Sequence, residues 1–413
     1  MSSSSSPSVS RTQIGLAVLV AALGYFVDIY DLILFSIVRV QSLTAIGVEK
    51  KDLMTKGILL LNMQMGGMLI GGILWGILGD KKGRLSVLFG SILMYSLANI
   101  ANGFVTSVPS YAVLRFIAGV GLAGELGAGV TLVAELLPKE TRGVGTTIIA
   151  SVGLLGAGLA GLVAKTFDWR TAYFIGGALG LALLALRLGV RESALFQGVA
   201  SSDVQKGNFL ALFKNRRRAI RFLSLVFVGL PIWYCVGILV TFSPEIGKSM
   251  GMTEVPPVGE SIVSMYVGGA FGDLLSGLLS QYLKKRKRVI FLFFALLALM
   301  AVVYFTWGTS SPTAFRRTCF MMGFGIGYWA LFVTMAAEQF GTNLRSTTTT
   351  TVPNFVRGAL VPLTLAFEWV KHVDRLGVRN GAIAVGVVTF TIALIALMSL
   401  EETFGKDLDF VEE

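Results

Sequence analysis

Long apolar stretches recur from one end of this 413-residue chain to the other, and no other feature of the sequence constrains its fold as strongly. An α-helix needs about 20 mostly apolar residues to cross the roughly 30 Å hydrocarbon core of a membrane. Twelve stretches reach that length, and they cover 14–38, 57–79, 85–104, 109–136, 143–165, 170–190, 219–246, 260–283, 288–308, 313–337, 346–370 and 377–400. The pattern predicts an all-α membrane protein with about twelve transmembrane helices.

The composition excludes most other classes of protein. Hydrophobic residues make up 54% of the chain and charged residues 14%, whereas soluble domains carry about a quarter charged residues. The two cysteines, Cys235 and Cys319, lie in apolar stretches without the spacing of a disulfide framework or a zinc site. Because the sequence also lacks a nucleotide-binding P-loop, an ATP-driven pump is not expected. No cofactor and no metal are predicted.

The net charge of +11 comes from basic residues clustered between the spans, notably at 81–84, 139–142, 214–218 and 284–288. Loops rich in Lys and Arg stay on the cytoplasmic side of a membrane. We therefore expect a multi-pass protein of a bacterial inner (plasma) membrane with both termini in the cytoplasm. The expected surroundings are a lipid bilayer rather than nucleic acid, and the expected state is a monomer.

Five regions follow from this pattern, and the two apolar regions resemble each other. They are a disordered N-terminal tail (1–13), a first six-helix bundle (14–190), a cytoplasmic linker (191–218), a second six-helix bundle (219–400) and an acidic C-terminal tail (401–413). Similar segments recur at an offset of about 202 residues, as in the stretch from Glu135 to Arg142 and the stretch from Glu338 to Arg345. The repeat predicts two pseudo-symmetric bundles related by an axis along the membrane normal.

Two segments carry the residues of a known family. They are Gly76, Asp80, Lys81, Gly83 and Arg84 after the second span, and Arg115-Phe-Ile-Ala-Gly119-Val-Gly121 in the fourth. These resemble the loop signature and the fourth-helix signature of the major facilitator superfamily. The resemblance covers nearly the whole chain and implies the major facilitator fold, with a loop that latches one conformation. The residues expected to take part in gating are Gly76, Asp80, Lys81, Gly83, Arg84, Arg115, Glu135, Arg142, Asp273, Gln281, Glu338 and Arg345.

Three acids inside the spans are candidates for proton coupling. Asp28 and Asp31 lie three residues apart on the first span, and Glu125 follows two glycines on the fourth. This arrangement resembles the proton-coupled metabolite and phosphate symporters of the superfamily. A buried carboxylate requires a partner, water or a proton, and two close acids disfavour double ionisation. The alternatives are structural pairing with a base for the aspartates, and a hydrogen bond across a glycine-rich helix interface for Glu125.

A second set of residues could bind the cargo. Aromatic and polar side chains lie in spans one, seven, ten and eleven, namely Tyr25, Tyr30, Trp233, Tyr234, Tyr328, Trp329, Asn354 and Arg357. Ring faces suit an organic substrate, and a buried Arg requires an anion, either a substrate group or an acid of the first bundle. Packing for the rings, and an ion pair or snorkelling for Arg357, are the alternatives.

These features favour a secondary active transporter, namely a proton-coupled symporter of a small polar or anionic metabolite that works by alternating access. The rivals are a proton-driven exporter of drugs or organic cations, a divalent metal carrier based on the carboxylates, and a transporter-like receptor. An enzyme is not expected, because no nucleophile and base stand out. The sequence leaves the substrate, the direction of transport and the coupling ion open.

Overall fold

The computed structural model describes residues 11–137, 142–187, 209–341, 344–373 and 376–406, and every regular element in these ranges is a helix. In the first half they are α1 (Arg11–Ala45), α2 (Leu53–Lys82), α3 (Arg84–Asn102), α4 (Val108–Leu122), α5 (Glu125–Leu136), α6 (Arg142–Leu154), α7 (Gly156–Thr166) and α8 (Trp169–Leu186). Most of the predicted linker and parts of both predicted tails lie outside these ranges.

The second half repeats this order of long and divided helices. Its elements are α10 (Ala211–Lys214), α11 (Arg216–Tyr234), the π-helix η2 (Cys235–Val240), α12 (Ser243–Ser249), α13 (Val258–Leu283), α14 (Arg286–Phe305), the 3-10 helix η3 (Gly308–Ser310), α15 (Pro312–Ile326), α16 (Trp329–Gln339), α17 (Arg345–Gly358), α18 (Leu360–Val370) and α19 (Gly377–Ser399). Each predicted span coincides with one long helix or with consecutive shorter ones.

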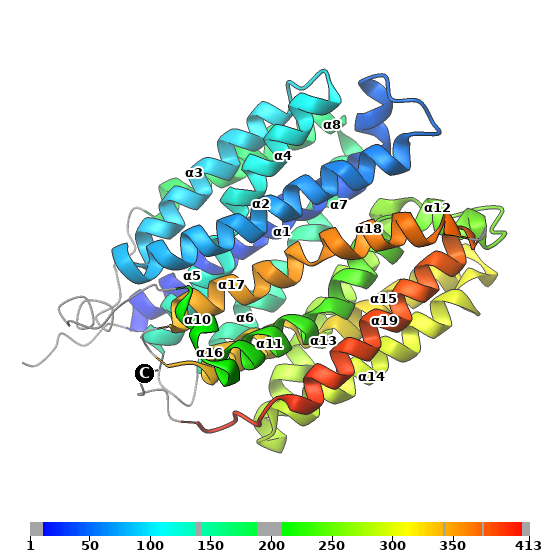
Figure 1. Ribbon diagram of the computed structural model, residues 1–413. Helices are drawn as coiled ribbons and strands as arrows, with labels where there is room; N and C mark the ends of the chain where they lie inside the picture. The colour runs from blue at the N-terminus through cyan, green and yellow to red at the C-terminus, as the bar shows by residue number, and fades with distance from the viewer. Residues whose placement is uncertain (1–10, 138–141, 188–208, 342–343, 374–375, 407–413) are drawn as a thin grey trace, which may run out of the picture.

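The two halves form two helical bundles that lie side by side, with α1 to α8 in one and α10 to α19 in the other (Figure 1). This confirms the predicted fold class. α1 begins and α19 ends at the same end of the molecule (Figure 1). We call this end the terminal face, and the other end, where α12 lies, the opposite face.

The internal repeat extends to the places where helices break. The fourth span breaks between Leu122 and Glu125, and the tenth breaks between Ile326 and Trp329. The fifth and eleventh spans break around Leu155 and Ala359 in the same way. A break inside a membrane leaves backbone groups without helical partners, so side chains from neighbouring helices have to bond them.

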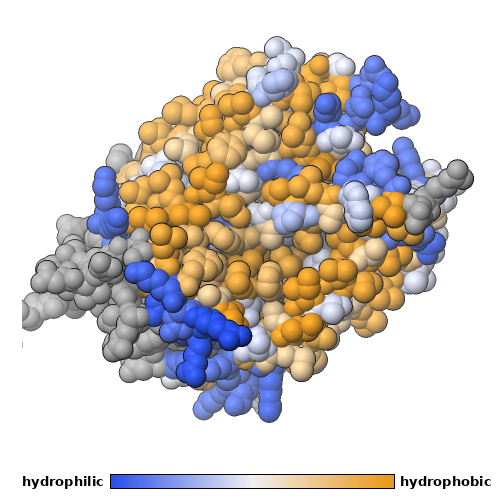
Figure 2. Space-filling model, in the orientation of Figure 1, coloured by the Kyte–Doolittle hydropathy of each residue, from blue (hydrophilic) through white to orange (hydrophobic). Residues whose placement is uncertain are grey.

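Eleven helical stretches within the described residues are long and apolar enough to cross a membrane. The eleventh predicted span, α17 and α18, is not among them, and its first half is polar, with five threonines in a row at 347–351 followed by Asn354 and Arg357. Thr348 and Thr351 donate their hydroxyls to the carbonyls of Leu344 and Thr347, so the polarity is satisfied within the helix. The surface in Figure 2 is largely apolar across its middle, with hydrophilic residues gathered toward both ends.

Candidate transport site

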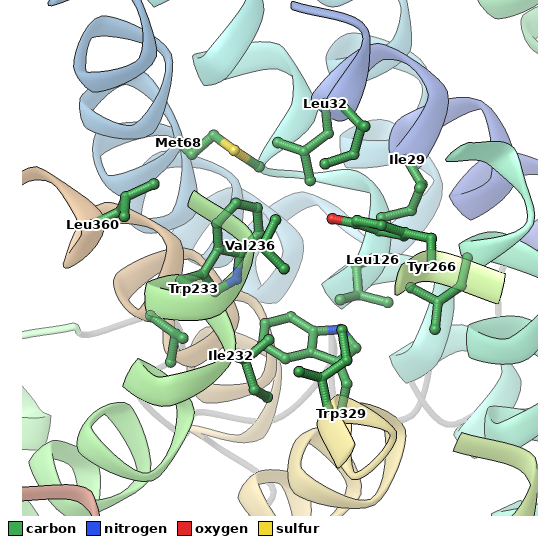
Figure 3. Packing of buried hydrophobic residues seen from close by; sticks show 14 of the residues in the cluster. Ile29, Leu32, Met68, Leu126, Ile232, Trp233, Val236, Tyr266, Trp329 and Leu360 are labelled. Carbon is green, nitrogen blue, oxygen red and sulfur yellow. The ribbon is translucent and has the colours of Figure 1, made fainter. Parts of the chain in front are cut away.

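A small cavity lies between the two bundles, lined by ten side chains from helices of both halves. They are Tyr25, Ile29, Leu154, Ile232, Trp233, Val236, Tyr266, Ile326, Trp329 and Arg357. Figure 3 shows Trp233, Trp329 and Tyr266 turned toward one space, with Ile29 beside Tyr266. Its free volume is about 20 Å³, which is room for about one water molecule. The cavity is therefore closed around its own side chains and must widen to take a substrate.

Arg357 supplies the positive charge at this cavity. It projects from α17 and is 1% exposed, and its Nη2 lies 3.7 Å from Oδ2 of Asp28 on α1. The distance is that of an ion pair but too long for a hydrogen bond. Neither carboxylate oxygen of Asp28 has a hydrogen-bond partner among the described residues, and the same holds for the Nε of Arg357. The pair thus joins the bundles and leaves donors and acceptors unused beside the cavity.

Aromatic rings surround the Arg357 guanidinium. Its central carbon lies 5.7 Å from the centre of the Trp329 ring and 6.0 Å from that of Trp233, within the range of a cation–π contact. Tyr25 from α1 and Tyr266 from α13 complete the walls. Four predicted substrate-binding residues, Tyr25, Trp233, Trp329 and Arg357, are thereby brought together.

The other predicted tyrosines lie away from the cavity. Their hydroxyls donate to backbone carbonyls inside their own bundles, Tyr30 to Ala172, Tyr234 to Ala382 and Tyr328 to Val228, at 2.7 to 3.0 Å. Each therefore braces a helix pair, which is the packing alternative for an aromatic side chain in a membrane helix.

Asn354 also lies beside the cavity rather than in its wall. Its Nδ2 donates to the carbonyl of Ala123 at 2.7 Å and to that of Thr350 at 2.8 Å. Ala123 lies in the break between α4 and α5, so Asn354 bonds a backbone group that the break frees. The Nη1 of Arg357 lies 3.5 Å from the amide oxygen of Asn354. Asn354 therefore connects Arg357 to the contact that it makes with Ala123 of the first bundle.

Asp31 is fully buried on α1, one helical turn beyond Asp28. The charges that act on it come from Asp28 and from Arg115 of α4. Arg115 is also fully buried, and it donates to the side-chain oxygen of Gln64 on α2. The structure thus places Arg115 among the acids of the first bundle.

Glu125 lies in an ion pair inside the first bundle. Arg187, just after α8, contacts both carboxylate oxygens, with Nη1 at 3.0 Å from Oε2, and both residues are about 1% exposed. A Cβ at Gly24 of α1 would overlap the Glu125 carboxylate and the Arg187 guanidinium. Glycine at that position therefore lets α1 pack directly on the pair, and Glu125 lies outside the cavity wall.

Residues of the predicted gate join the two bundles at the terminal face. Asp80 at the end of α2 is 5% exposed and accepts from the backbone N–H of Thr347 at 3.0 Å and from its hydroxyl. Thr347 lies in the first turn of α17, where a negative charge interacts favourably with the free N–H groups. Gly76 packs against the same residue, and Gly83 has a φ of 95°, which the turn into α3 requires.

The remaining gate candidates are distributed around this face. Lys81 is exposed, Gln281 is half-buried, and the Nε of Arg345 donates to the carbonyl of Ala337 at 3.3 Å. Glu338 pairs with Arg286 within the second bundle, with two contacts of 2.6 Å. The side chains of three further candidates, Arg84, Glu135 and Arg142, lie outside the described part of the structure.

Asp273 has a different place from the other gate candidates. It lies fully buried on α13, and its Oδ1 accepts from the backbone N–H of Ala330 at 2.9 Å. Ala330 is in the first turn of α16, directly after the break of the tenth span. Asp273 therefore holds the helix start that carries Trp329 of the cavity wall.

Comparison with protein families matches residues 14–359 to the model described as Major Facilitator Superfamily. The chain belongs to the Major Facilitator Superfamily. This membership confirms the resemblance inferred from the two signatures, and the prediction that the chain is a transporter rather than an enzyme.

Relatives within the superfamily are distant in sequence but matched over most of their length. The chain is 25% identical to a probable 4-methylmuconolactone transporter of Cupriavidus pinatubonensis, with 94% of this chain and 91% of that protein covered. It is 26% identical to a gentisate transporter of Corynebacterium glutamicum (94% and 88% covered) and 26% identical to the niacin transporter NiaP of Acinetobacter baylyi (84% and 85%).

Solved structures agree in fold. The xylose transporter XylE from E. coli, in a partially occluded inward open conformation, superposes with a TM-score of 0.71 over 96% of this chain and 100% of that one, at 18% identity. XylE bound to 6-bromo-6-deoxy-D-glucose gives a TM-score of 0.72 at 16% identity, with 97% and 98% covered. Identities this low support a shared fold and nothing finer.

Several residues of this superfamily member were not singled out from the sequence. Arg39 of α1 is fully buried and its Nη2 donates to Glu245 of α12 at 2.8 Å, across the bundles at the opposite face. Arg187 and Tyr266 were missed as well. Arg39 and Arg187 lie near span ends, where basic residues are common, so sequence position alone does not mark them. Tyr266 could have been found, since it is an aromatic residue in the middle of the eighth span.

No group of three or more His, Cys, Asp or Glu side chains is placed to hold a metal ion within the described ranges. The predicted proton-coupling, substrate-binding and gating roles are not decided by these positions, and they enter below as proposals.

Proposed function

We propose that this chain is a proton-coupled symporter of small aromatic carboxylates. The observation that carries the proposal is the pairing of Arg357 and Asp28 at the rim of a cavity walled by Trp233 and Trp329. A guanidinium binds a carboxylate with two hydrogen bonds, and indole faces pack on a flat ring. The named substrates of the relatives, which include gentisate and niacin, are in keeping with this chemistry.

Coupling to protons follows because Asp28 and the substrate carboxylate use the same guanidinium, that of Arg357. A substrate carboxylate that binds Arg357 takes the place of Asp28 as its counter-ion. Asp28 is fully buried, and an unpaired carboxylate in a membrane interior is strongly unfavourable, so Asp28 binds a proton as the substrate arrives. One carboxylate and one proton then move together, and the net charge of the loaded site equals that of the empty one.

The two bundles carry this site across the membrane by rocking about it. With the terminal face in the cytoplasm, as the clusters of basic residues predict, the substrate enters from the opposite face and leaves at the terminal face. Asp31 lies one helical turn from Asp28, Arg115 lies near Asp31, and neither lines the cavity, so we assign them to proton transfer rather than to substrate contact.

An exporter of organic cations is less well supported. Arg357 is the charged residue that lines the cavity among the described side chains, and it would repel a cationic drug. A site for such a drug would instead present a free carboxylate in the cavity wall. Asp28 is paired, Glu125 lies in a separate ion pair with Arg187, and Asp31 does not line the cavity.

Uptake into proteoliposomes tests the proposal. Radiolabelled nicotinate and gentisate are expected to accumulate when the outside is acidic, and a collapsed proton gradient should stop accumulation. Arg357→Ala should weaken substrate affinity roughly 10- to 100-fold through loss of charged hydrogen bonds, and Arg357→Lys should restore it in part. Asp28→Asn should abolish the response to the proton gradient while counterflow of labelled substrate persists. Uptake of these compounds that ignores both the gradient and Asp28→Asn would refute the coupling.

A further inference from the structure

A second and much larger hollow lies at the opposite face, between α7 of the first bundle and α13 of the second. Its volume is about 990 Å³. The groove is lined along α1 by Ile37 and Val40, along α7 by Leu162 and Lys165, and across from them by Lys248 of α12 and Glu260 of α13. We call it the α7–α13 groove.

Elsewhere near this face, side-chain bonds bridge the two bundles at two places. At the first, Arg39 binds Glu245, and the Thr241 hydroxyl donates to Ser36 at 3.3 Å. At the second, the Thr364 hydroxyl donates to Asn62 at 2.7 Å. Between α7 and α13, α7 touches α13 at Gly161, where a Cβ would overlap Val263.

Gly161 and Val263 both line the groove, and their contact lies close to the central cavity along the helices. Val263 lines the groove and Tyr266, three residues further along α13, lines the cavity. A rise of about 1.5 Å per residue separates them by about 4.5 Å along the helix. On α1, Ile37 of the groove lies eight residues from Ile29 of the cavity, about 12 Å. A small separation of α7 from α13 would connect the two spaces.

The groove carries a net positive charge on an apolar wall. Its charged side chains are Lys165, Lys248, Arg316 and Glu260. Arg316 and Glu260 pair with each other at 3.3 Å, whereas Lys165 and Lys248 are exposed and form no ion pair with any described residue. Two unpaired ammonium groups beside aliphatic residues complement a ligand with one carboxylate and one apolar ring.

We propose that the α7–α13 groove is the entry vestibule for the aromatic carboxylate, with Lys165 and Lys248 binding its carboxylate before α7 and α13 part. The inference rests on the proposed function, because the occupant is the substrate of the central site. Lys165 and Lys248 bind the substrate first at the α7–α13 groove, and Arg357 binds it afterwards in the central cavity.

Uptake kinetics of charge variants test this vestibule. Lys165→Glu and Lys248→Glu each change the charge by two units, and each should raise KM for nicotinate roughly 30-fold, because one unit at contact distance in water is worth about fivefold. The double variant should raise KM further, with kcat unchanged. Added salt should raise the wild-type KM by screening the attraction, and it should lower the KM of the double variant by screening the repulsion between its glutamates and the substrate carboxylate. Lys50→Glu makes the same charge change at an exposed position of the same face outside the groove, and it should leave KM unchanged.

Chemical labelling of the lysines tests the vestibule without measuring transport. Benzoate should protect Lys165 and Lys248 from an amine-reactive reagent, and it should do so in Arg357→Ala protein as well, whereas Lys50 should react equally with and without benzoate. Equal KM values for all three lysine variants, or no protection, would overturn the vestibule while leaving wild-type uptake and the proposed function intact. Protection by vesicles of anionic phospholipid but not by benzoate would also overturn it, in favour of a lipid site. If the wild-type protein takes up no aromatic carboxylate, both proposals fail.

Discussion

The two faces of the molecule are closed by different kinds of contact. Between the central cavity and the terminal face the bundles pack closely, because Gly72 of α2 and Gly127 of α5 leave room for the side chains of Asn354 and Thr350 of α17. At the opposite face the chief contact is the ion pair of Arg39 and Glu245, and α7 meets α13 at Gly161 beside the α7–α13 groove. Contacts through glycine tolerate no added atoms, whereas an ion pair can separate and re-form. We therefore expect the terminal face to be the more tightly closed of the two faces in this conformation.

The largest expected effect on uptake comes from disrupting the contact between Gly72 and Asn354. A Cβ at Gly72 would lie 2.7 Å from the Cβ of Asn354, so Gly72→Leu should prevent closure of the terminal face and lower uptake at least 100-fold. Alkylation of a Thr350→Cys variant should become fast in this background. Gly66→Leu on the same helix is the control, because a Cβ there meets nothing within 4 Å. Equal loss of uptake in both variants would mean that the glycine contact has no special role.

A smaller effect is expected from the ion pair of the opposite face. Glu245→Gln leaves the fully buried Arg39 without its counter-charge, and breaking a buried pair costs about 3–5 kcal/mol; we expect a lower value here because Glu245 is 23% exposed. Arg39→Met should cost less, because the Glu245 that remains can reach water. Thermal unfolding in detergent measures both. A larger loss of stability for Arg39→Met than for Glu245→Gln would contradict this order.

The polar part of the terminal closure should matter less than its glycines. Asp80→Asn keeps an acceptor for the N–H of Thr347 but removes the negative charge at the start of α17, an effect of about 0.3–1 kcal/mol. Uptake should slow about two- to fivefold, and Asp80→Ala should slow it further. Exchange and uptake rates measured side by side separate slower opening from weaker binding. An unchanged rate for Asp80→Ala would assign the terminal closure to the glycines alone.

The smallest effect is expected at a cap that belongs to neither closure. Asp168 precedes α8 and accepts from the N–H groups of Arg170 and Thr171, and the Thr171 hydroxyl and these N–H groups lower the pKa of Asp168. Because this pKa is lower in the folded state, the stabilisation is present above the ordinary pKa of an aspartate and is lost as the pH falls. Asp168→Ala should cost about 1 kcal/mol at neutral pH and leave uptake unchanged. Equal unfolding temperatures at pH 7 would show that the cap contributes nothing.

The sequence by itself determined the spans, the repeat, the superfamily and the depth of each polar residue in the membrane. Length and apolar content decide whether a helix can cross the bilayer, and the residues that carry the loop and fourth-helix signatures lie close together in the chain. It also singled out Tyr25, Trp233, Trp329 and Arg357, because ring faces suit an organic substrate and a basic residue inside a span requires an anion.

Only the tertiary structure decided which of these side chains face the cavity. The depth of a residue in the membrane follows from its position in the chain. The direction in which its side chain points depends on how the helix packs, because successive side chains differ in direction by about 100° around the helix axis. Tyr234 therefore bonds the backbone of α19 while its neighbour Trp233 lines the cavity. In the same way Glu125 meets Arg187, 62 residues away in the chain, because Gly24 lets α1 pack against them. No local pattern could have paired them.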